Sequence, residues 1–447
     1  MSTEQDNQLL SGSIFKSLTT FTIPILFALL LQVMYSTVDM LVVSNFASTA
    51  DVSAVANGSQ LMNLLVSACT GIATGATILL AQYFGKNDVK NINKVVGNSI
   101  TLFIFLSSLI TIIFVLLNQL FVYLLNVPSE AITSTSQYLF YASLGIPMIF
   151  LYNIIGSIFR GIGDSKTALV TVAIACIINI ILDLIFVIAF SMGAKGAAIA
   201  TTIAQATSVI LSYIIFTKNR NFSLTHRDFV PDFSMLKKIL FLGIPLALQS
   251  LLVSLSFLLI TIIINKFGIV YSAAVGVVEK LTGLIMLVPM AFMQSISIFT
   301  SQNRSVGNHD RTKRGLTISI STSLVVGITM AYLSFFHSEL LLSIFKPEPA
   351  VVKIGIGYLK SYAFDTIFVC VLFNISGFFN GYEKSFFVML QAVIGALFIR
   401  VPLAFLFSTI TPTSLFMIGI STPIATFLQI ISCFFYYFYL KNKKNLY

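Results

Sequence analysis

IPILFALLLQVMYSTVD, residues 23–39, is an apolar segment with a proline near its start and a carboxylate at its end. A proline inside a helix removes a backbone donor and crowds the preceding turn, so we expect Pro24 to act as a hinge. An ionisable side chain within a membrane span costs about 3 kcal/mol on insertion scales, so Asp39 needs a specific role there. The segment therefore predicts a membrane helix that can bend, with Asp39 as a proton or cation site.

Polar residues between the proline and the carboxylate share one face of this helix. Gln32, Tyr35 and Ser36 lie seven, four and three positions before Asp39, which places all four side chains on the same side. A polar stripe must face protein or water, because lipid offers it no hydrogen-bond partners. We therefore predict that the helix lines an internal cavity, with Gln32 and Tyr35 among the residues that contact a substrate.

The composition is that of a membrane protein. Of 447 residues, 57% are hydrophobic and only 9% are charged, whereas a soluble domain carries about 25% charged residues. Long apolar runs recur along the whole chain and predict twelve membrane-spanning helices. The predicted spans are 15–44, 52–82, 95–122, 133–160, 167–190, 195–217, 236–265, 273–301, 315–343, 352–379, 386–408 and 415–440.

Lys and Arg gather in alternate connections, so the net charge of +10 indicates orientation and not nucleic-acid binding. The basic connections follow spans two, four, six, eight and twelve, and the others carry few basic residues. The connection after span nine, with Lys346 and Lys353, is the exception. The pattern predicts that both termini are cytoplasmic and that the protein lies in the cell membrane.

The two halves of the chain repeat each other at an offset of 220 or 221 positions. The matched pairs are Ile23–Pro24 with Ile244–Pro245, Gln82 with Gln302, Tyr138–Leu139 with Tyr358–Leu359, and Gly161 with Gly381. We predict an all-α integral membrane protein with two pseudo-symmetric six-helix bundles, 1–217 and 236–447, joined by a cytoplasmic loop at 218–235. Because each half has an even number of spans, the repeat is parallel and its axis lies along the membrane normal.

A second carboxylate, Asp183, lies at a depth similar to that of Asp39. It is 17 residues after Lys166, about 25 Å along a helix, and Asp39 is 23 residues after Lys16, about 35 Å along a helix that we expect to tilt. Asn179 lies one turn from Asp183 on the same face. Burial and a second nearby carboxylate both disfavour the charged form, so the pair could bind protons during transport. A purely structural role in helix packing is the alternative.

The second half has its own polar residues within spans. Glu279 and Lys280 are adjacent and could form an internal ion pair or a bridge near the interface. Asp365 could serve function or helix packing. Arg400 could pair with Asp365 or Glu279, or could extend toward the interface; we favour a structural role.

Enzyme motifs are missing from the sequence. It contains no P-loop, nucleophile elbow or HExxH motif, and its three histidines form no ligand cluster. The four cysteines lie inside apolar spans without CxxC spacing, which implies neither a disulfide nor a metal site. We expect no enzymatic activity, no cofactor and no bound metal.

Several segments resemble the multidrug and toxic compound extrusion (MATE) transporters, which have the MATE/MOP-type fold. The resemblance rests on the twelve spans, the repeat and the Ile-Pro opening of each half. It rests also on RGIGDSK (160–166), NIILD (179–183) and GAKGAAIAT (193–201). It covers essentially the whole chain and implies a secondary active transporter.

Within that family the chain is similar to the DinF-like branch, in which an Asp follows the first-helix proline by fifteen residues, as Asp39 follows Pro24 here. The resemblance implies a coupling network of Asp39, Asn179, Asp183 and Thr201, completed by Gln32 and Tyr138. It also implies export driven by protons, with sodium as the alternative ion, and bending of the first helix as the switch. The NorM-like branch has a Glu in helix seven, which residues 243–257 lack, and Asp365 lies about one turn from its helix-ten acid.

Our first hypothesis is therefore an antiporter that exports amphipathic, often cationic compounds, as a monomer in the lipid bilayer. A lipid-linked saccharide flippase of the same superfamily is the second, but such proteins commonly need a strongly cationic cavity. Only Lys280 and Arg400 are basic residues that we place well inside spans. The third hypothesis, from another class, is an intramembrane enzyme or a receptor that transports nothing.

Overall fold

The computed structural model describes residues 9–218, 224–345, 347–410 and 414–443, and within these ranges all regular secondary structure is helical. Eleven helices are long and apolar enough to cross a membrane. A bent pair, Ser129–Leu144 with Ile146–Gly161, adds a twelfth span if its two arms, which meet at 47°, are counted together. The described part of the chain thus confirms the prediction of an all-α membrane protein and accommodates the twelve predicted spans.

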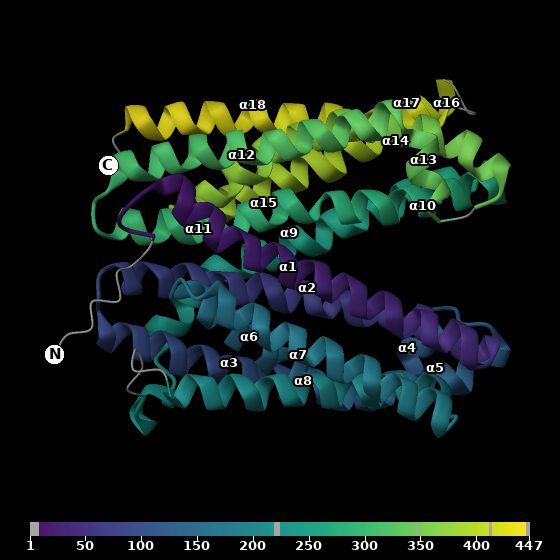
Figure 1. Cartoon of the computed structure of the whole chain (residues 1–447), viewed down its shortest axis with the longest axis horizontal. Helices are drawn as coiled ribbons and strands as arrows, with labels where there is room; N and C mark the ends of the chain where they lie inside the picture. Colours follow the sequence, from purple (N-terminus) through teal and green to yellow (C-terminus); the bar gives the residue numbers. More distant parts are fainter. Residues whose placement is uncertain (1–8, 219–223, 346, 411–413, 444–447) are drawn as a thin grey trace. The chain divides into compact units, whose positions relative to one another are not determined.

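The chain divides into two compact units, which share two helices (Figure 1). The shared helices are α1 (Ile14–Phe46) and α9 (Phe233–Asn265). Unit 2, Phe27–Ala247, contains α2 (Thr49–Gly85), α3 (Val89–Leu116), α4 (Asn118–Leu124), η1 (Ser129–Ala131), α5 (Ile132–Leu144), α6 (Ile146–Gly161), α7 (Ser165–Asp183), η2 (Leu184–Ala189), α8 (Gly193–Lys218) and η3 (His226–Phe229). Unit 1, residues 1–26 and 248–447, contains α10 (Ile269–Ile285), α11 (Leu287–Ser305), α12 (His309–Phe336), α13 (Ser338–Ser343), α14 (Pro349–Gly381), α15 (Ser385–Val393), η4 (Ile394–Arg400), α16 (Val401–Ile410), α17 (Leu415–Gly419) and α18 (Ser421–Asn442).

Both unit boundaries fall just beyond a proline inside a long helix. Helix α1 runs unbroken through Pro24, and the boundary follows Leu26; α9 runs unbroken through Pro245, and the boundary follows Ala247. Each unit therefore includes the first part of the other half's opening helix. These contact-based units differ from the bundles 1–217 and 236–447, which stay a prediction of how the chain divides functionally.

The helix bounds repeat at the offset that the sequence predicts. Helices α3 and α12 have 28 residues each and begin 220 positions apart, at Val89 and His309. The long α14 of unit 1 is uninterrupted, whereas its counterpart in unit 2 is bent at Gly145, between α5 and α6. A side chain at Gly145 would collide with the Thr202 hydroxyl of α8, so the close approach of α8 to this bend requires glycine.

In unit 1, the segment before α1 is held by hydrogen bonds from side chains of α11 and α12. The Arg311 guanidinium donates hydrogen bonds to the backbone carbonyls of Leu9, Ser11 and Gly12, at 3.3, 2.7 and 2.8 Å. Asn303 Nδ2 also donates to the Leu9 carbonyl, at 3.0 Å. Gly12 has a φ of +67°, a conformation that glycine adopts without strain. One cationic side chain thus holds the turn that leads into the first helix.

In unit 2, the segment before α9 is fastened to α3 in the corresponding way. Lys94 forms an ion pair with Asp232 at 3.2 Å. The Asn98 side chain donates to the Asp228 carbonyl at 3.2 Å and accepts from the Asp232 backbone N–H at 2.7 Å. The two repeats therefore use third-helix side chains to hold the entry of the shared helices.

Candidate functional site

Three helices of unit 2 bring the predicted network together. Thr201 Oγ1, on α8, donates to Asp39 Oδ2, on α1, at 3.3 Å. Asn179 Nδ2, on α7, lies 3.4 Å from the same Thr201 oxygen, which accepts its proton. The Asp183 carboxyl group, one turn beyond Asn179, is close enough to Asp39 to interact with it electrostatically. All four predicted residues thus meet in one place, although they come from three separate segments.

The carboxyl groups of this cluster have few donors. Asp183 is completely buried, and in the part of the chain that the structure describes no N–H or hydroxyl group donates to either of its oxygens, which interact with the Asp39 carboxyl group. Asp39 Oδ1 and Asn179 Oδ1 are covered and unpaired within the same residues. Two ionised carboxylates without donors would carry a large desolvation cost in such a site. The cluster is therefore suited to hold a proton or a small cation.

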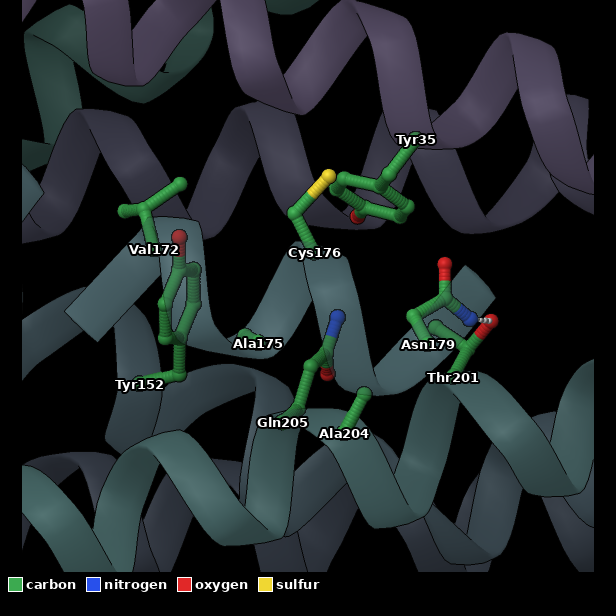
Figure 2. Close-up of a pocket in the computed structure, with 9 residues that line it drawn as sticks. All are labelled: Tyr35, Tyr152, Val172, Ala175, Cys176, Asn179, Thr201, Ala204 and Gln205. Atoms are coloured by element: carbon green, nitrogen blue, oxygen red, sulfur yellow. Dashed lines mark hydrogen bonds between the residues drawn. The ribbon is translucent and has the colours of Figure 1, made fainter. Parts of the chain in front are cut away.

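A small cavity lies beside this cluster, between α1, α6, α7 and α8 (Figure 2). Its lining residues are Tyr35, Tyr152, Val172, Ala175, Cys176, Asn179, Thr201, Ala204 and Gln205. Figure 2 shows Asn179 and Thr201 joined by their hydrogen bond at one end of this group and Tyr152 at the other. The cavity volume is about 20 Å³, room for about one water molecule, whereas a drug-sized ligand fills about 300–1,000 Å³. In this conformation it is a water-sized site.

The predicted cavity residues take three different positions around this space. Tyr35 lines the cavity. Gln32 contacts it indirectly, because its Nε2 donates to the Tyr152 hydroxyl at 3.1 Å. Tyr138 packs against Gly58, where no other residue type would leave room for its ring, and lies within electrostatic reach of both carboxyl groups.

Sequence reasoning missed six lining residues, of which Tyr152, Cys176 and Gln205 have polar or ionisable side chains. A signal for two of them was present. Gln205 lies four positions after Thr201, and Cys176 lies three before Asn179, so both extend predicted polar faces by one turn. Tyr152 does not extend a predicted polar face, so the sequence gives no signal for it. The packing of α6 brings it to this site.

In unit 1, the two predicted acids lie in separate places with separate donors. Asp365 is buried and accepts a hydrogen bond from Thr426 at 2.6 Å. Glu279 is half-buried and accepts from Thr261 at 3.5 Å. The internal ion pair between Glu279 and Lys280, one of the two alternatives, is not among the ion pairs of the described residues, and Lys280 is exposed. Adjacent residues on a helix point about 100° apart, which separates the two charges.

Arg400 is buried, with 6% of its surface exposed, which excludes the alternative that it extends to the interface. Its guanidinium hydrogen-bonds Ser256 and, at 3.4 Å, the Val253 carbonyl, and it lies 3.9 Å from the centre of the Phe257 ring. It interacts electrostatically with Asp365 but forms no direct ion pair with it among the described residues. The guanidinium thus joins η4 to α9, consistent with the structural role favoured above.

A family model described as MatE matches the chain twice, over residues 24–185 and 245–406. The second match begins 221 positions after the first, which confirms the internal repeat. A relative from Bacillus subtilis named "Probable multidrug resistance protein YoeA" is 26% identical over 449 residues, covering 97% of this chain and 96% of the relative. Another, "Probable multidrug resistance protein YpnP" from the same organism, is 28% identical and covers 89% of each chain.

Solved structures share the fold. One, described as the outward-facing conformation of a multidrug resistance MATE family transporter of the MOP superfamily, has a TM-score of 0.91 at 21% identity and covers 98% of both chains. A MOP superfamily transporter from Pyrococcus furiosus matches with the same TM-score at 22% identity, again covering 98% of both chains. These likenesses confirm the predicted MATE/MOP-type fold.

Proposed function

The chain belongs to the MatE family, and we propose that it is a secondary active antiporter that exports amphipathic, often cationic compounds in exchange for protons. The family membership supports a membrane transporter in preference to an enzyme. The names of its relatives, which call them multidrug resistance proteins, support multidrug export. The assignment to the DinF-like branch is part of the proposal.

The observation that carries proton coupling is the donor-poor carboxyl pair in unit 2. Asp39 receives one hydrogen bond, from Thr201, and Asp183 receives none from the described residues. Two negative charges side by side in an apolar site repel each other, so the pair retains a proton unless a cation replaces it. Adding or removing one proton therefore changes the charge of the site, which is the property that a coupling site requires.

The position of Asp39 on α1 links this charge to a movement. Its carboxylate accepts a hydrogen bond from Thr201 of α8. Seven residues earlier on α1, Gln32 donates a hydrogen bond to Tyr152 of α6. Protonation makes the Asp39 carboxyl group a weaker acceptor, so the hydrogen bond from Thr201 weakens. We propose that α1 then takes a different position. Pro24 is the proposed hinge, because the missing backbone donor lowers the resistance of the helix to bending. The substrate can drive this step only through its different affinity for the two states.

Three alternatives are part of the same test. Sodium could replace the proton, because the cluster offers unpaired oxygens from Asp39, Asn179 and Asp183. A flippase for lipid-linked saccharides would need basic residues around its cavity, and the residues lining the cavity in the described part of unit 2 include no Lys or Arg. A receptor that transports nothing would show no solute flux after reconstitution.

We also propose that the protein acts as a monomer in the cell membrane with both termini in the cytoplasm.

Dye uptake into inside-out vesicles, which corresponds to export from the cell, tests the proposal. Either a proton or a sodium gradient is imposed, and wild type is compared with Asp39→Asn and Asp183→Asn. Asp310→Asn, whose side chain is 92% exposed, is the matched control for loss of a carboxylate. We expect the proton gradient alone to drive uptake, both network variants to lose it, and the control to retain it. Uptake that survives in both network variants would overturn the proposal.

A further inference from the structure

Polar residues of unit 2 continue away from the carboxyl pair in one common direction. On α1, Gln32 lies seven residues before Asp39, and on α8, Gln205 lies four residues after Thr201. Helix α1 begins, and α8 ends, on the side that we predict to be cytoplasmic, so both steps lead toward the cytoplasm. Seven residues of helix correspond to about 10 Å. The water-sized cavity occupies this stretch.

The contacts along this stretch form a nearly continuous polar path. Tyr35 interacts with the Gln205 side chain and, electrostatically, with Tyr152. The Tyr152 hydroxyl is held by Gln32 at 3.1 Å and lies within electrostatic reach of Arg160. Arg160 is in the last turn of α6, where it is partly exposed, and its Nη2 donates to Ser157 Oγ at 2.8 Å. The path therefore leads from the buried carboxyl pair to a partly exposed helix end.

The groups on this path differ in what they can do with a proton. A hydroxyl or a water molecule can donate and accept at the same oxygen, so it can receive a proton on one side and release another on the other. The amides of Gln32 and Gln205 orient their neighbours but do not carry a proton in this way. Arg160 keeps its charge, so it cannot serve as a carrier. Tyr152 is therefore the hydroxyl best placed to pass protons between the cavity and the end of α6.

We propose that the cavity is the cytoplasmic proton-release route of the carboxyl pair, with Tyr152 as its relay hydroxyl and Gln205 as a positioning residue. The inference rests on the proposed antiport function. A carboxyl group gives its proton to water in the cavity, that water passes one of its protons to the Tyr152 oxygen, and the hydroxyl releases its own proton to solvent water at the partly exposed end of α6, beside Arg160. One proton enters and one leaves each oxygen, so no group is consumed. The ionisable side chains facing the route are Tyr35, Asp39, Tyr138, Tyr152, Arg160, Cys176 and Asp183.

Proton release by the reconstituted full-length protein, followed with a pH-sensitive dye enclosed with the cytoplasmic face, tests the route. Tyr152→Phe removes only the hydroxyl oxygen. Tyr213→Phe, on α8 and 63% exposed, is the matched control. We expect Tyr152→Phe to slow proton release and maximal transport at least about tenfold, with substrate affinity unchanged and a larger solvent deuterium isotope effect. The control variant should match wild type in all three measurements.

Filling the cavity provides a second test that leaves every polar group in place. Ala204→Leu adds apolar volume to the cavity lining and should displace the water, so we expect proton release to slow as it does in Tyr152→Phe. If both variants bind substrate and release protons at the wild-type rate while Asp39→Asn is inactive, the route is wrong and the antiport function stands. If Asp39→Asn itself transports normally, the proposed function fails.

Discussion

The two halves of the repeat treat their buried acids differently. In unit 2, Asp39 and Asp183 share one site, receive few hydrogen bonds and have no basic side chain beside them in the described cavity lining. In unit 1, Asp365 has its own donor in Thr426 and has the buried Arg400 within electrostatic reach. The comparison teaches that the same scaffold can hold a pair of donor-poor carboxyl groups in one half, which we propose gains and loses protons, and a charge-balanced acid in the other.

The difference between the two halves can be seen by comparing residues that are 221 positions apart in the sequence. Asp39 corresponds, at an offset of 221, to Ile260, which is buried in an apolar cluster of unit 1. At the same offset, Asp183 corresponds to Ala404, a buried member of that cluster. Unit 1 therefore lacks both acids of the pair at the places where the repeat would put them. Its own acids arise elsewhere on the helices and meet different partners.

The largest expected difference between the halves is in transport. Asp183→Asn removes a titratable group that has no substitute, so proton-driven export should fall by a factor of about 100 or more. Asp365→Asn removes an acid that is already balanced, and we expect less than about a threefold loss. Initial rates of dye uptake at matched protein levels measure both. A larger loss in Asp365→Asn than in Asp183→Asn would reverse the comparison.

The next effect concerns stability. Arg400→Met keeps much of the side-chain length but leaves the Val253 carbonyl, Ser256 and Asp365 without their cation, which should cost about 2–3 kcal/mol. Thermal unfolding of the purified protein measures the loss. Adding Asp365→Asn to this variant should restore part of it, because the uncompensated charge is then removed. No recovery in the double variant would show that Arg400 does not balance Asp365.

A smaller effect is expected at the turn before α1. Arg311→Ala removes three charge-assisted hydrogen bonds to backbone carbonyls in unit 1, but the guanidinium is partly exposed, so we expect a loss of about 1 kcal/mol. Hydrogen exchange of residues 9–14 should increase, while exchange in α3 stays unchanged. In Lys94→Ala, hydrogen exchange should increase at residues 228–235 and stay unchanged at residues 9–14. Equal changes at both segments in either variant would contradict two independent attachments.

The smallest effect is a pH dependence at Asp232. The hydrogen bond from Lys94, followed by that from the Met235 backbone N–H, holds the pKa of Asp232 below its usual value. The contribution of Asp232 to stability is therefore present above the unfolded-state pKa of about 4 and is lost as the pH falls through the lower folded-state value. Unfolding midpoints between about pH 2 and about pH 6, which extends about two units either side of the unfolded-state value, should show this loss. Asp232→Asn should remove that part of the pH dependence, and an unaltered profile in the variant would exclude the assignment.

Much of the fold and the centre of the candidate site follow from spacing along the sequence. Asp39, Asn179 and Asp183 stand out because polar residues recur on one face of apolar helices, and that periodicity needs no tertiary information. The repeat can be detected because equivalent helix positions in the two halves have the same residues, such as the prolines inside α1 and α9. The predicted helices also agree with the observed ones to within several residues.

Other features depend on packing between distant segments. Tyr152 enters the site only because α6 lies against α8, and the sequence around it is an ordinary apolar span. Arg400 has a side chain long enough to reach several environments, and its contacts with Ser256 and Phe257 select one of them. The unit boundaries beyond Pro24 and Pro245 reflect which helices each part of α1 and α9 contacts, information that composition does not contain.

Counting the protons exchanged when substrate binds would test the central claim most directly. Purified protein in weakly buffered detergent solution is mixed with a transported dye, and the pH change is measured for wild type, Asp183→Asn and Asp365→Asn. We predict that wild type and Asp365→Asn release about one proton per protein, whereas Asp183→Asn releases none while still binding the dye. Release that persists in Asp183→Asn and disappears in Asp365→Asn would contradict the account and place proton coupling in unit 1.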